Sequence, residues 1–131
     1  MIKFFTKYKI IFYSSNFILI LLYLFPGSLI GCFLYNDCKL QPQITRDYII
    51  SSNHLYAFAI LSLIGFLTYK NSKKIRYLSA YLITVSIFLE IFHNFIPERS
   101  FEYSDLFGNL AGVIIVIIVF NLLKIYENSK N

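Results

Sequence analysis

Charged residues and recognisable catalytic motifs are both scarce in this chain. Only 15% of its 131 residues are charged, whereas 57% are hydrophobic, and the mean hydropathy is +0.62. The sequence has no Walker-type phosphate loop, no GxGxxG pattern and no GxSxG pattern, which argues against the common nucleotide-binding and serine-hydrolase folds. A soluble domain of this size has too little interior to bury so much apolar surface. The composition therefore predicts a small all-α, polytopic membrane protein.

Cysteine is also scarce. Cys32 and Cys38 are the only two, and they form neither a CxxC pair nor a Cys/His zinc pattern. A disulfide between them is one interpretation, if their loop lies outside the cytoplasm, and a pair of packing residues is the other. The sequence predicts no metal and no cofactor.

Four apolar segments predict a four-transmembrane-helix bundle within a single domain, residues 1–131. The segments are residues 10–25, 54–69, 77–96 and 106–123. All four should be helical, because a bilayer offers the backbone no water to bond. The basic start of the chain is similar to a signal peptide, but no small-residue cleavage site follows cleanly, so we expect the first span to be retained. Residues 28–35 either extend a kinked first helix or lie at the membrane interface.

The distribution of basic residues predicts the orientation of these spans. Nine of the twelve lie in segments on one side of a four-span protein: Lys3, Lys7, Lys9, Lys70, Lys73, Lys74, Arg76, Lys124 and Lys130. The positive-inside rule then places both termini in the cytoplasm and residues 28–53 and 97–105 outside. The net charge of +5 and pI of about 9.2 are explained by these lysines and anionic lipid. We therefore expect no nucleic-acid partner.

Polar and ionisable residues are concentrated in residues 89–112, which is unusual for this chain. Glu90 and His93 share one helix face, as do Asp105 and Asn109. An ionised carboxylate inside a membrane costs about 2.5 to 3.5 kcal/mol on insertion scales. Glu90 should therefore point into the bundle and bond to a polar partner.

Several partners and roles are open for these residues. His54, His93 and Arg99 are the available partners of Glu90, and the predicted topology brings all of them to the outer leaflet. On a structural interpretation, Glu90 pairs with Arg99, and Asp105 or its rival Ser104 caps the last helix. Gly108 and Gly112 are four residues apart and indicate close helix packing. On a functional interpretation, the outer leaflet carries a binding site of six residues: His54, Glu90, His93, Arg99, Asp105 and Asn109.

The stretch from Glu90 to Gly112 resembles the VanZ-like family, small bacterial membrane proteins associated with teicoplanin resistance. The positions that match the family pattern are Glu90, Pro97, Arg99, Phe101, Asp105, Asn109 and Gly112, and residues 54–58 resemble part of an upstream element. The resemblance covers residues 48–123. Ile50 and Ser51 stand where the family usually has Asp-Lys, and His93 stands where it usually has Gln, so His93 is not expected to be an obligatory metal ligand.

The resemblance implies a multi-pass protein of the bacterial cytoplasmic membrane and cell envelope that modulates teicoplanin susceptibility. We expect the outer site to bind a lipid headgroup, a lipid-linked wall precursor or a lipoglycopeptide, with Arg99 on the anionic group. The alternative is an intramembrane hydrolase or transferase acting on lipid substrates through Glu90, His93 and Asp105. A purely structural or assembly subunit is a third hypothesis. The sequence does not decide whether the chain forms a homo-oligomer.

Overall fold

The chain is all-helical. The computed structural model describes residues 2–130, with the side chains of residues 8–130, and no strand occurs in that part. The helices are α1 (Ile2–Leu24), α2 (Leu29–Tyr35), α3 (Ser52–Tyr69), α4 (Ile75–Phe92), the short 3₁₀ helix η1 (His93–Phe95) and α5 (Tyr103–Ser129). The all-α prediction is confirmed, and each of the four apolar segments is a helix.

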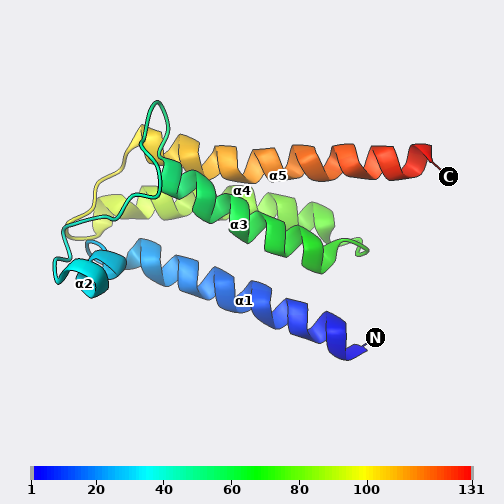
Figure 1. The fold of residues 1–131 in the computed structure, drawn as a ribbon, viewed down its shortest axis with the longest axis horizontal. Helices are drawn as coiled ribbons and strands as arrows, with labels where there is room; N and C mark the ends of the chain where they lie inside the picture. Colours follow the sequence, from blue (N-terminus) through cyan, green and yellow to red (C-terminus); the bar gives the residue numbers. More distant parts are fainter. Residues whose placement is uncertain (1, 131) are drawn as a thin grey trace.

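The four long helices lie along a common direction, with α3 packed against α1, α4 and α5. Both chain ends and the α3–α4 turn lie at one end of the molecule (Figure 1). α2, the long loop that follows it and the α4–α5 connection lie at the other end (Figure 1). Residues that are far apart in sequence, near 25, 54, 90 and 105, are therefore brought to the same end.

α1 and α2 are two separate helices joined by a sharp bend. Gly27 has a φ of +83°, a conformation that side chains rarely tolerate, and the two helix axes meet at 82°. The Ser28 side chain caps α2 by accepting a hydrogen bond from the Gly31 N–H at 3.0 Å. Cys32 and Cys38 are joined in a disulfide. Residues 28–35 thus form their own short helix, and the disulfide ties it to the loop that follows.

Glycine allows α3 and α5 to pack closely. A Cβ atom on Gly108 would lie 2.6 Å from the Ser51 carbonyl oxygen, and one on Gly112 would lie 2.8 Å from the Ala59 nitrogen. The Ser51 N–H also donates to the Ser104 carbonyl at 3.0 Å, which joins the starts of the two helices. The packing role that the four-residue glycine spacing predicted is confirmed.

The first turn of α3 is held by the loop before it. Ser51, at the N-cap position, makes no side-chain capping bond. Instead, an Asp47 carboxylate oxygen accepts a hydrogen bond from the Ser52 N–H at 2.7 Å. This hydrogen bond lowers the pKa of Asp47. Asp47 therefore anchors the polar loop to the end of α3 that carries His54.

Two helices are long and apolar enough to cross a membrane: α4 together with η1, and α5. The bent pair of α1 and α2 is a third candidate. Within the described residues α3 is not a candidate, since Ser52, Asn53 and His54 make its first turn polar. Large apolar side chains point outward, including Phe17 and Leu122, which are 62% and 60% exposed. Apolar side chains facing outward, together with ionisable groups buried in the bundle, are typical of a membrane protein.

Candidate functional site

Polar side chains from four helices meet in the interior, near the end of the bundle that carries α2. Glu90 and Asn109 are fully buried, and His93 and Tyr23 nearly so. The His54 side chain is 12% exposed and that of Asp105 is 20% exposed. Of the six predicted residues, five therefore gather around one point, and they come from α3, α4, η1 and α5.

Asn109 fixes the hydrogen-bonding roles of its neighbours. Its side-chain nitrogen donates to the Ser86 carbonyl at 3.1 Å, so its Oδ1 atom is left as an acceptor. The Tyr23 hydroxyl donates to this Oδ1 at 2.7 Å, and His54 Nδ1 lies 3.0 Å from it. The Tyr23 hydroxyl oxygen also lies 3.0 Å from His54 Nδ1, but its one hydrogen is donated to Asn109. Both neighbours of Nδ1 are then acceptors, so we assign the ring hydrogen to Nδ1. His54 Nε2 is then the atom with a free lone pair.

Glu90 points into the bundle, as the sequence predicted. Its Oε1 atom accepts a hydrogen bond from the Glu102 N–H at 3.0 Å. Its Oε2 atom is buried and has no hydrogen-bond partner among the described residues. That oxygen faces His93 Nδ1 at 3.3 Å and His54 Nδ1 at 3.9 Å. The two histidines, and not Arg99, are the polar neighbours of this carboxylate.

The orientation of His93 is set by a backbone carbonyl. His93 Nε2 lies 3.1 Å from the Tyr23 carbonyl oxygen, and only an N–H can bond to that acceptor. In a neutral ring, Nδ1 then presents a lone pair to Glu90 Oε2. The His54 Nε2 lone pair faces Asp105 Oδ2 in the same way, at 3.4 Å. Each of these two contacts places a ring-nitrogen lone pair against a carboxylate oxygen, so two hydrogen-bond acceptors face each other. Such a contact is unfavourable unless a positive charge lies between the two atoms.

Arg99 lies in the α4–α5 loop and bonds to α1 instead of to the acidic residues. Its guanidinium donates to the carbonyls of Leu22 at 3.2 Å and Phe25 at 3.3 Å, at the end of α1. Burial lowers the pKa of Arg99. No carboxylate of the described residues lies within 4.0 Å of it, so the Glu90–Arg99 pair considered from the sequence is not formed.

Asp105 is not the cap of the last helix, so that interpretation of the sequence was wrong. The helix begins earlier than the apolar run, at Tyr103, and Glu102 occupies the N-cap position without a side-chain capping bond. Asp105 lies in the first turn, where the helix dipole favours a negative charge. Its side chain faces His54, so it belongs to the buried site.

Two cavities adjoin at this site. One, of about 410 Å³, is mostly apolar and lies between α1, α2 and α3, where Leu22, Leu29, Ile30, Leu34, Ala57 and Ile60 line it. The other, of about 260 Å³, is polar, and Lys39, Glu98, Glu102, Asp105 and His93 are among its lining residues. His54 and Arg99 line both. The site thus offers an apolar compartment next to a charged one.

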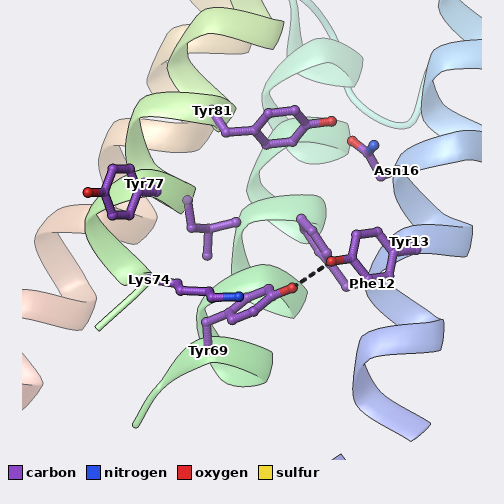
Figure 2. Close-up of a pocket in the computed structure, with 8 residues that line it drawn as sticks. Phe12, Tyr13, Asn16, Tyr69, Lys74, Tyr77 and Tyr81 are labelled. Carbon is purple, nitrogen blue, oxygen red and sulfur yellow. Dashed lines mark hydrogen bonds between the residues drawn. The ribbon is translucent and has the colours of Figure 1, made fainter. Parts of the chain in front are cut away.

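A third cavity, of about 320 Å³, lies at the opposite end of the bundle, between α1, α3 and α4. Figure 2 shows the Tyr13 and Tyr69 hydroxyls facing each other, and they lie 2.9 Å apart in a hydrogen bond. Tyr81 extends from α4 toward the Asn16 amide on α1 (Figure 2). Among the described residues that line this aromatic cavity, Lys74 is the only lysine, arginine, histidine or carboxylate, so the cavity offers less chemistry than the site at the α2 end.

Sequence reasoning missed Tyr23 and Ser86. Tyr23 donates to Asn109, and its ring stacks on that of His93 with centroids 5.6 Å apart. The chain has 11 tyrosines, and nothing in the first apolar segment distinguishes this one from the rest. Ser86 contributes a backbone carbonyl, which leaves no sequence signal.

No protein-family model, curated protein or solved structure matches this chain. The fold and the site therefore define its class by themselves. It is a small helical bundle with the features of a membrane protein and a buried cluster of ionisable residues at one end.

Proposed function

We propose that this chain is a VanZ-like integral membrane protein of the bacterial cell envelope that binds an anionic amphiphile at the outer leaflet. The amphiphile would be a lipid, a lipid-linked wall precursor or a lipoglycopeptide, and its binding would modulate teicoplanin susceptibility. The observation that carries the proposal is the pair of adjoining cavities, one apolar and one polar, with Arg99 and His54 lining both.

The two cavities suit the two parts of an amphiphile. An acyl chain would lie against the apolar walls of α1, α2 and α3, where burial gains roughly 25 cal/mol per Å² of apolar surface. An anionic headgroup would lie in the polar cavity beside Arg99 and Lys39. Arg99 donates one N–H from each of two nitrogens to α1, so three of its five N–H groups remain for a phosphate or carboxylate.

The proposed topology has four transmembrane helices with both termini in the cytoplasm and the site outside. The arrangement in Figure 1, with both chain ends and the lysine-rich α3–α4 turn together, is compatible with it. The Cys32–Cys38 disulfide lies at the opposite end, and disulfides persist in oxidising compartments. α3 would cross as the central helix, packed against α1, α4 and α5, with its remaining apolar face outward.

Binding can be tested on the purified protein in neutral detergent, with phosphatidylglycerol and phosphatidylcholine as probes and native mass spectrometry as the measurement. We expect saturable retention of phosphatidylglycerol and weaker retention of phosphatidylcholine. Arg99→Gln should reduce the preference by at least about tenfold, since a charged hydrogen bond contributes about 1.5 to 3 kcal/mol. Ile60→Trp should reduce retention of both lipids, because the larger side chain fills the apolar cavity.

The matched control is Arg46→Gln, because Arg46 is an arginine of the α2–α3 loop that lines neither of the two cavities. It should bind like the unchanged protein. Equal retention of both lipids, or equal effects of Arg46→Gln and Arg99→Gln, would remove the support for a headgroup site. Multiple turnover of a lipid substrate, abolished by Glu90→Gln, would favour the hydrolase or transferase alternative.

Topology gives a second test. With Cys32 and Cys38 left oxidised, single cysteines at Ser72 and Ser100 should react with a membrane-impermeant maleimide in intact cells only at position 100. Position 72 should react only after the membrane is opened, because it lies in the turn between α3 and α4. Labelling of both positions from the same side would contradict the four-span topology and the shared outer site.

A further inference from the structure

We infer that His54, Glu90 and Asp105 form a binding site for a divalent transition-metal ion, for which zinc is the reference. One ligand atom from each of the three lies within 4.8 Å of the other two. The three come from α3, α4 and α5, so the site would join the three helices that form the centre of the bundle. The sequence alone predicted no metal, because the spacing of residues 54, 90 and 105 along the chain does not show that they meet in space.

A buried carboxylate oxygen without a hydrogen-bond partner in the described part of the chain is the second, independent observation. Glu90 is 0% exposed, and its Oε2 atom has no hydrogen-bond partner among the described residues. His54 Nδ1 donates its hydrogen to Asn109, so Nε2 presents a lone pair to Asp105 Oδ2 at 3.4 Å. A buried acceptor without a donor is costly. A cation bound between the three residues would give Glu90 Oε2 a partner and would separate the His54 Nε2 and Asp105 Oδ2 acceptors.

The geometry and the ligand types point to zinc or a similar ion. Ligand atoms about 2.1 Å from a zinc ion stand about 3.4 Å apart in a tetrahedron. The His54 Nε2–Asp105 Oδ2 distance of 3.4 Å already has that value. The other separations are at most 4.8 Å, so the ligand atoms would need to approach by no more than about 1.4 Å. One imidazole with two carboxylates suits zinc, manganese or iron better than calcium or magnesium, which prefer oxygen ligands.

The surroundings of the three residues resemble those of a supported metal site. Metal-binding histidines almost always donate their second N–H to an acceptor that fixes the ring, and Asn109 Oδ1 is that acceptor for His54. Asp105 and His54 line the polar cavity, which gives the ion a path, and water in that cavity would supply a fourth ligand. The inference goes beyond the proposed function, since it requires no lipid.

The test uses the full chain in neutral detergent, treated with a chelator, dialysed and titrated with zinc chloride by calorimetry, without added lipid. We expect one zinc ion per chain. Asp105→Asn should weaken binding by more than about 100-fold, since loss of a ligand exceeds the 10- to 100-fold effect typical of the groups behind it. Glu90→Gln should do the same. Cobalt as a second probe should give an absorption spectrum of four-coordinate geometry that Asp105→Asn abolishes.

Glu102→Gln is the matched control, because this carboxylate lines the same polar cavity but its side chain is outside the ligand set. It should bind zinc as the unchanged protein does. The inference is overturned if the unchanged protein binds no zinc, or if Asp105→Asn binds it with unaltered affinity. Asp105 is partly exposed, so this variant decides the matter even if Glu90→Gln fails to fold.

Discussion

Replacing Gly112 with leucine should destabilise the bundle more than a substitution on any outward-facing position of α5. A Cβ atom at this position would lie 2.8 Å from the Ala59 nitrogen and still closer to the Leu55 carbonyl oxygen, so α3 and α5 must separate. Overpacking of this kind costs about 1 to 3 kcal/mol. The separation would also pull Asn109 away from His54 and Tyr23, whose hydrogen bonds cross the same interface.

Whether Gly112→Ala raises or lowers the melting temperature distinguishes the effect of packing from that of helix propensity. Propensity alone would make alanine more stable than glycine by about 1 kcal/mol in a helix. We expect the opposite, a lower melting temperature in detergent, because the added methyl meets backbone atoms that cannot move independently. Val119→Leu adds bulk to a half-exposed position of the same helix and should leave the melting temperature unchanged. A stabilised Gly112→Ala would show that the two helices pack more loosely than described.

Glu90→Leu should be strongly destabilising, whereas Glu90→Gln should be as stable as the unchanged protein when both are measured with a chelator present. Glutamine keeps an oxygen for the Glu102 N–H and places an amide N–H opposite the His93 Nδ1 lone pair. Leucine leaves both groups buried without a partner, at a cost of about 1 to 3 kcal/mol each. The measurement is thermal unfolding in detergent followed by circular dichroism.

Glu127→Leu is the control for removing a carboxylate. Glu127 pairs with Lys70 at 3.4 Å, but both side chains are exposed, and such pairs contribute little. Glu127→Leu should therefore lower the melting temperature by less than Glu90→Leu does. If Glu90→Gln proved as damaging as Glu90→Leu, the charge of the carboxylate, and not its hydrogen bonds, would be what the fold requires.

Hydropathy and helix-ending residues predicted the helices well, because these signals are local. The long apolar runs predicted all four long helices, and Pro26-Gly27 predicted the end of α1. The ends of α5 were less accurate: the helix starts at Tyr103 and continues to Ser129, beyond the apolar run at both ends. Helix ends depend on capping and on contacts with neighbouring segments, so periodicity locates them poorly.

Five of the six residues named from the sequence lie together in the buried cluster, but their hydrogen bonds were not predicted. The cost of a charge inside a membrane was enough to predict that Glu90 points inward, and the spacing of Gly108 and Gly112 was enough to predict close packing. Both predictions need only the residue type and its position along one helix, so no knowledge of the neighbouring helices was required. The partners of Arg99 could not be predicted from the sequence, because they are backbone carbonyls at the end of α1, and every residue type has a backbone carbonyl.

By itself, the sequence determined that this chain is helical, that its helices are largely apolar, and that the polar residues His54, Glu90, His93, Asp105 and Asn109 lie near one end of the predicted spans. Only the tertiary structure decided which atoms meet there. The direction of the Asn109 amide sets the tautomer of His54, and the Tyr23 carbonyl sets that of His93. The physical reason is that hydrogen bonds depend on the position and orientation of single atoms across helices separated by dozens of residues, whereas hydropathy is a property of each segment alone.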